Sequence, residues 1–206
     1  RLRLSFQNAP VGHSRLAAVM TDHLQRPVRR AGDGGRASGM SGKSLRLAYV
    51  PLTDAAPVII AREMGFAASE GVALDLVQAR SWALLRDFLS AGTVEAAHML
   101  APMAVARAMG LQASLPPVEV LMVLSHGGQV IGTSTALARD LPPLTGAAQA
   151  ADAIRSAAGP RPRVGVPFAF STHALLMGRW LGRGIEIRTV PPPLMAEALA
   201  RGEIDL

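Results

Sequence analysis

Three side chains in this sequence have the type and the local setting to bind a small anion. His173 lies in the first turn of a predicted helix, where free backbone N–H groups and the positive end of the helix dipole favour negative charge. Trp82 opens another predicted helix directly after a strand, and its indole N–H can donate a hydrogen bond without adding charge. Gln129 stands at a strand–turn junction with a donor amide. The alternative roles of these three residues are helix capping, hydrophobic packing and turn formation, respectively.

The sequence contains little evidence for catalysis, metal binding or nucleotide binding. The sequence has no cysteine, and it lacks a nucleophile elbow, a pair of catalytic carboxylates and the HExxH spacing of a metalloprotease. The stretch 37–44 loosely resembles a phosphate loop, but it precedes a strand, whereas a phosphate loop follows one. His98 lies in an apolar strand, which is typical of a core histidine. We therefore predict no enzyme activity, no bound metal and no cofactor.

Composition and charge narrow the class of protein further. The chain has 206 residues, of which 50% are hydrophobic and 17% charged, so it is long and apolar enough to build a core. The formal net charge is +6, but nine basic and only two acidic side chains fall in residues 1–46, which leaves the remainder nearly neutral. A basic face with stacking aromatics is absent, so we expect no direct nucleic-acid binding. Residues 1–44 are predicted to be a disordered basic extension.

Strands and helices alternate from residue 45 onward, which is typical of βαβ units around a parallel sheet. The predicted strands are 45–50, 73–77, 94–99, 118–124, 129–134, 163–166 and 185–190, with another beginning at Ile204. The predicted helices are 56–64, 82–89, 102–109, 148–158, 171–181 and 194–200, the first two with Asp54 and Ser81 as N-caps.

This pattern divides the chain into an α/β lobe over 45–140, a crossover over 141–160 that begins with a Pro-rich stretch, and a partial second α/β lobe over 161–206. A parallel strand that begins at the last residues suggests that the chain is truncated at its C-terminus.

An ordered set of segments resembles one known family. The segments are Leu45–Pro57, Ser81-Trp82, Ala96–Met103, Phe170–His173, Val190–Pro193 and Met195–Asp205. Together they resemble the nitrate-binding family of ABC-transporter substrate-binding proteins, which includes bicarbonate-binding relatives. The resemblance implies an α/β, type II periplasmic-binding-protein-like fold, with two lobes of parallel-rich sheets and an incomplete second lobe.

The resemblance also implies a site and a ligand. Trp82, Gln129 and His173 fall on the family's anion-contacting positions, and Thr53 lies in a loop that would line the cleft, as a weaker candidate. Ala174 stands where relatives often carry asparagine, and the family's cleft lysine has no counterpart in this sequence. The implied function is that of a solute-binding protein for nitrate or nitrite, with an ABC permease as partner.

Three alternatives remain open at this stage. The chain resembles equally a cytosolic nitrate sensor that acts on an RNA-binding antitermination regulator, and it could be a bicarbonate-binding relative. An enzyme of thiamine-precursor synthesis on the same fold is the third. The location depends on the start of the protein: cytoplasmic if Met40 is the first residue, and periplasmic or membrane-associated if a signal peptide is missing.

Overall fold

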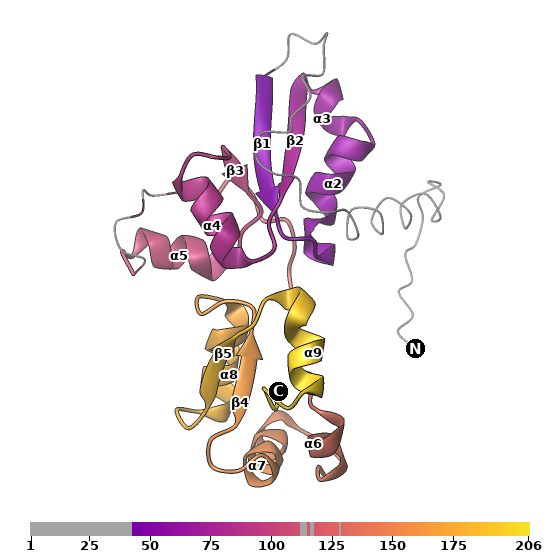
Figure 1. Ribbon diagram of the computed structural model, residues 1–206, viewed down its shortest axis with the longest axis vertical. Helices are drawn as coiled ribbons and strands as arrows, with labels where there is room; N and C mark the ends of the chain where they lie inside the picture. Colours follow the sequence, from indigo (N-terminus) through magenta and orange to yellow (C-terminus); the bar gives the residue numbers. More distant parts are fainter. Residues whose placement is uncertain (1–42, 112–114, 116–117, 128) are drawn as a thin grey trace.

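The computed structural model describes residues 43–111, 115, 118–127 and 129–206, which form two α/β bodies (Figure 1). We call residues 43–111 the first body and residues 135–206 the second body. The predicted extension 1–44 lies outside the described residues, apart from Lys43 and Ser44. These two residues begin a strand and are not part of an extension.

The first body is built on a parallel sheet with the strand order β2-β1-β3. Its strands are β1 (Lys43–Tyr49), β2 (Val72–Gln78) and β3 (Ala96–Ala97). The central strand pairs with β2 along its whole length, from Lys43 opposite Val72 to Tyr49 opposite Gln78. The predicted strands here are confirmed, although the third forms a ladder over only two residues.

Helices connect and cover these strands. They are η1 (Thr53–Ala55), α2 (Ala56–Glu63), α3 (Phe66–Ser69), α4 (Trp82–Ser90) and α5 (Ala101–Ala108). The cap at Ser81 is confirmed, because its hydroxyl accepts a hydrogen bond from the Leu84 N–H at 3.1 Å. The cap predicted at Asp54 is wrong. A turn of 3-10 helix comes before α2, so Ala55 takes the N-cap position and the Asp54 carboxylate is left for another role.

The second body holds a two-stranded parallel sheet and four α-helices among the residues that the structure describes. Its elements are α6 (Thr135–Arg139), α7 (Ala147–Ala157), β4 (Arg163–Val166), α8 (Thr172–Leu181), β5 (Glu186–Thr189), η2 (Pro192–Leu194) and α9 (Met195–Ala200). The strand expected from Ile204 is not formed. Residues 204–206 nevertheless run beside β4, since the Gly165 N–H donates to the Leu206 carbonyl at 2.8 Å.

The first body has two apolar clusters and the second body has one, and side chains of the loop after β4 join the two bodies. The core of the second body gathers residues from α6, α7, β4 and α8, among them Leu137, Ile154 and Val166. Phe168 follows β4 in that body, yet it packs in the core of the first body together with Trp82. The two bodies therefore touch at the loop that leads into α8. The lobe and crossover boundaries given above remain predictions.

The strands expected at 118–124 and 129–134 are not formed in the part of this segment that the structure describes. The apolar alternation is real, but Leu121 is 77% exposed and Val130 is 88% exposed. A strand needs a hydrogen-bonding neighbour. Among the described residues, neither 118–124 nor 129–134 pairs with the outer edge of β3. Sequence periodicity cannot show whether such a neighbour exists, which explains the error.

Gly165 allows a close approach between β4 and the last residues of the chain. A Cβ atom there would lie 2.5 Å from Ile204 Cδ1 and 2.8 Å from Met195 Sδ. We expect Gly165→Ala to lower the free energy of unfolding by about 1–3 kcal/mol, the usual cost of overpacking a core. Urea unfolding followed by the fluorescence of Trp180 measures this change.

Gly178→Ala is a matched control for that variant. Gly178 lies inside α8, and no atom lies within 4 Å of the place that an alanine Cβ would occupy, so alanine should stabilise the helix by about 0.5–1 kcal/mol. Two glycine-to-alanine changes in one body should thus shift stability in opposite directions. Equal effects would contradict the packing of residues 204–206 against β4.

Candidate anion-binding site

Four polar side chains follow the carboxyl ends of four parallel strands. They are Asp54 after β1, Trp82 after β2, His98 after β3 and His173 after β4. In open parallel α/β sheets, ligands bind at this end of the strands. The backbone holds the first three in place: His98 N–H, for example, donates to the Ala48 carbonyl of β1 at 2.8 Å.

The same four residues carry buried polar atoms without a hydrogen-bond partner. Within the described residues these atoms are Asp54 Oδ1, Trp82 Nε1, His98 Nδ1 and His173 Nδ1. A buried polar atom without a partner costs about 1–3 kcal/mol, so proteins rarely keep one without a reason. A ligand with acceptor oxygens could pair with N–H groups of Trp82 and of the two histidines, although not with Asp54 Oδ1, which is itself an acceptor. We call these four residues the polar cluster.

Direct contacts join three members of the polar cluster. Nε2 of His98 lies 3.5 Å from Oδ2 of Asp54. The rings of His98 and Trp82 meet edge to face, with centroids 5.3 Å apart and planes at 63°. Both rings are buried, with 6% of His98 and 1% of Trp82 exposed. The prediction that His98 is a core histidine is correct as to burial, but its neighbour is a carboxylate and one of its nitrogens is unpaired.

His173 comes from the second body and completes the cluster across the contact between the bodies. Ser171 caps α8 by accepting a hydrogen bond from Ala174 N–H at 3.1 Å, so the imidazole is not needed as a cap. Burial lowers the pKa of His173, and the negative charge of Asp54 opposes this shift.

The remaining predicted contacts, Gln129 and Thr53, are both exposed. Gln129 is exposed on the strand-free connection between the bodies. Thr53 is also exposed, although it begins η1 directly before Asp54. Trp82 and His173 carry buried polar atoms without a partner, whereas Gln129 and Thr53 do not. The anion-contacting roles of all four residues remain predictions.

Sequence reasoning missed two members of the cluster. Local pattern indicates a helix cap for Asp54 and an ordinary core position for His98. One signal could have found Asp54, because it follows the carboxyl end of the predicted strand 45–50, as Trp82 follows 73–77 and His173 follows 163–166. His98 lies inside the predicted strand 94–99, so this signal does not mark it. The pairing of Asp54 with His98 joins positions far apart in the chain, and local pattern does not report such contacts.

Other features of the described residues lie apart from this cluster. A surface hollow in the second body shares no residue with it; the lining residues are Asp140, Pro142, Ala153, Ser156 and Ala157. No group of three or more His, Asp or Glu side chains among the described residues could hold a metal ion. None of the described helices is long and apolar enough to cross a membrane.

The two α/β bodies, with polar side chains from both at the carboxyl ends of parallel strands, define a partial type II periplasmic-binding-protein fold. Solved structures agree with this class. The periplasmic nitrate-binding protein NrtA from Synechocystis matches with a TM-score of 0.67 and 28% identity, over 80% of this chain and 46% of that one. Residues 39–206 match the NMT1-like family, and the chain belongs to that family.

Curated relatives agree with the resemblance seen in the sequence. The nitrate/nitrite binding protein NrtA of Nostoc is 31% identical over 173 residues, which is 78% of this chain and 39% of the relative. The bicarbonate transport ATP-binding protein CmpC of Synechococcus elongatus is 32% identical over 81% of this chain and 26% of the relative. The chain thus spans less than half the length of these two relatives.

Proposed function

We propose that this chain supplies the anion-contacting residues of a solute-binding protein for a small planar oxyanion, nitrate or nitrite, in an ABC uptake system. The observation that carries the proposal is the polar cluster, in which residues from both bodies carry buried polar atoms without a hydrogen-bond partner. An oxyanion offers several acceptor oxygens in place of water, so one ligand can satisfy several donors at once. The similarity to a nitrate/nitrite binding protein and to a bicarbonate transport ATP-binding protein supports the choice of ligand and of transport system.

The cluster favours binding over catalysis. Trp82 donates from a neutral indole, and His173 stands at the N-terminus of α8, where unpaired N–H groups and the helix dipole attract negative charge. These groups replace the hydration shell of an anion, and none of them is a nucleophile. Because the donors come from both bodies, an anion would also hold the bodies together, which is how a two-lobed receptor reports occupancy.

Calorimetric titration of the 206-residue chain with nitrate, nitrite, bicarbonate, sulfate and chloride tests the proposal. We expect nitrate or nitrite to bind and chloride and sulfate to give no heat of binding. If no planar oxyanion binds, the proposed function is wrong for this chain. Binding of bicarbonate in preference to nitrate would correct the ligand and keep the site.

Trp82→Phe probes the indole donor in the same titration. Phenylalanine keeps most of the packing but removes Nε1–H, so affinity for nitrate should fall about tenfold, the value of one hydrogen bond of about 1.4 kcal/mol. Trp180→Phe is the matched control. Nε1 of Trp180 donates to the Ala147 carbonyl at 2.6 Å in the second body, so this variant should lose stability but keep its affinity.

A further inference from the structure

The two ring nitrogens of His98 have different surroundings, and this difference decides which of them can donate a hydrogen bond. Nε2 of this imidazole faces the Asp54 carboxylate at 3.5 Å, while Nδ1 is buried without a partner. A neutral imidazole has one N–H, and beside a carboxylate that hydrogen belongs on the nitrogen that faces it. Nδ1 of neutral His98 is then an acceptor. Nitrate has acceptors only, so the two cannot form a hydrogen bond.

We propose that the oxyanion binds together with one proton, which His98 takes up so that Nε2 donates to Asp54 and Nδ1 donates to the anion. This inference rests on the proposed function and assigns His98 and Asp54 a part in the same site. The proton comes from solvent and stays on the imidazole while the anion is bound. No bond of the anion is made or broken.

Charge balance within the polar cluster leads to the same conclusion. Asp54 on η1 is negative, and an anion placed near it would be repelled in a buried site where charges interact strongly. His98 and His173 are the titratable groups that face Asp54 from the first and second bodies. The nearby arginines have other partners. Arg86 on α4 lies over the Phe168 ring at 5.9 Å and pairs with Asp87. Arg62 pairs with Glu63 at the end of α2 that is far from Asp54. A proton on His98 would offset the negative charge of Asp54, because the two side chains lie beside each other.

Proton uptake can be counted because nitrate does not titrate near neutral pH. The 206-residue chain is titrated with nitrate between about pH 6 and 8, in two amine buffers of different ionisation enthalpy. The expected result is net uptake of protons with the anion and an affinity that falls as pH rises. Binding that takes up no proton and does not change with pH would overturn the inference while leaving the proposed function intact. If the chain binds no oxyanion, both fail together.

Two variants locate the proton. In His98→Gln the amide donates without titrating, so uptake should vanish and affinity at about pH 6 should fall about tenfold. In Asp54→Asn the amide can donate to Nε2, so neutral His98 can carry its hydrogen on Nδ1 and donate it to the anion. Proton uptake should then vanish, and affinity at about pH 8 should rise about tenfold. These opposite changes in affinity, with the same loss of uptake, are specific to the proposed pair.

His126→Gln is the control, because His126 is exposed on the connection between the bodies. This variant should keep the proton uptake of the wild type. Uptake that persists in both His98→Gln and Asp54→Asn would place the proton elsewhere and refute the assignment. Circular dichroism establishes that each variant is folded, and if His98→Gln is not, Asp54→Asn still decides the question.

Discussion

Replacing His173 with alanine should weaken nitrate binding by about 10- to 100-fold. The imidazole lies at the N-terminus of α8 with a buried, unpaired Nδ1, so it is placed to donate to an anion. A hydrogen bond to a charged partner contributes about 1.5–3 kcal/mol, which corresponds to this range of affinity. Titration calorimetry of the wild type and the variant measures the change directly.

Two further readouts separate loss of binding from loss of fold in that variant. Alanine removes an unsatisfied buried nitrogen, so the thermal midpoint should stay the same or rise. Leu175→Ala, at an exposed position on the same helix, should leave affinity unchanged. Unaltered nitrate affinity in His173→Ala would contradict the assignment of the site to the polar cluster.

His173 should also leave a signature in the dependence of stability on pH. Because burial lowers the pKa of this imidazole, the unfolded chain binds more protons than the folded chain between the lowered value and the ordinary value of about 6.5. Stability should therefore fall as pH drops below about 6.5 in the absence of ligand. Urea unfolding at several pH values should show a smaller fall in His173→Ala.

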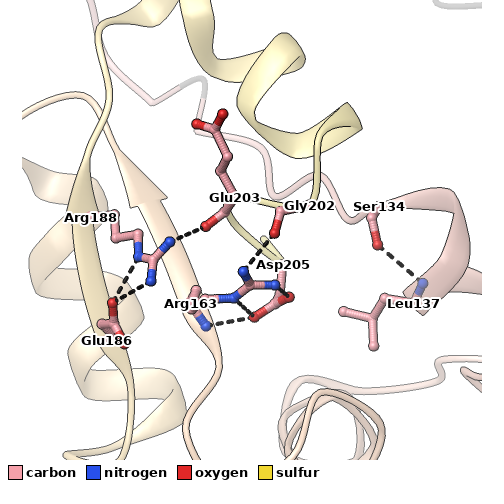
Figure 2. A network of polar contacts seen from close by, with 8 residues as sticks. All are labelled: Ser134, Leu137, Arg163, Glu186, Arg188, Gly202, Glu203 and Asp205. Atoms are coloured by element: carbon pink, nitrogen blue, oxygen red, sulfur yellow. Dashed lines mark hydrogen bonds and ion pairs between the residues drawn. The ribbon is translucent and has the colours of Figure 1, made fainter.

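Asp205→Ala should lower the free energy of unfolding of the second body by about 2–3 kcal/mol, because it removes charge-assisted hydrogen bonds. Figure 2 shows the Asp205 carboxylate beside the guanidinium of Arg163, the first residue of β4. The carboxylate accepts from Arg163 Nη2 at 2.6 Å, from Nε at 3.0 Å and from the backbone N–H at 2.8 Å. Asp205 also fixes the connection between the bodies, since its carbonyl accepts from Ser134 N–H at 3.3 Å.

The contribution of Asp205 should depend on pH with a defined sign. The Arg163 guanidinium holds the pKa of this carboxyl below its usual range. The stabilisation is then complete above the unfolded pKa of about 3.9 and is lost as pH falls through the lower, folded value. The difference between wild type and Asp205→Ala should shrink over that acid range.

Urea unfolding monitored by tryptophan fluorescence in a Trp82→Phe background, which leaves Trp180, reports on the second body. Asp152→Ala in the same background serves as the control. Asp152 pairs with Arg155 on α7, but its side chain is 76% exposed, so its loss should cost less than about 0.5 kcal/mol. Equal costs for the two aspartates would show that residues 204–206 are not anchored to β4 as Figure 2 draws them.

Much of the fold follows from local pattern. Alternation of apolar runs and helical spacing predict β1, β2, β4 and β5 and the main helices to within a few residues, and the cap at Ser81 is correctly predicted. These features depend on neighbours within one turn or one strand, so the sequence encodes them directly. The short helices α3 and α6 are not predicted, since helices of only one turn or so give little periodicity.

The sequence alone indicated the class of fold and the family, and it predicted anion contacts at Trp82 and His173, because each of these depends on residue type and local setting. Only the tertiary structure decided that Asp54 faces His98 and that both stand with Trp82 and His173. Asp54, Trp82 and His98 lie far apart in the chain and meet because the parallel strands β1, β2 and β3 bring their carboxyl ends to one edge of the first sheet. His173 follows β4 of the other sheet, and the two bodies touch at the loop that leads to it. The same reason explains the failure at 118–134: a strand forms only where another strand lies beside it, and that is a property of the assembled sheet.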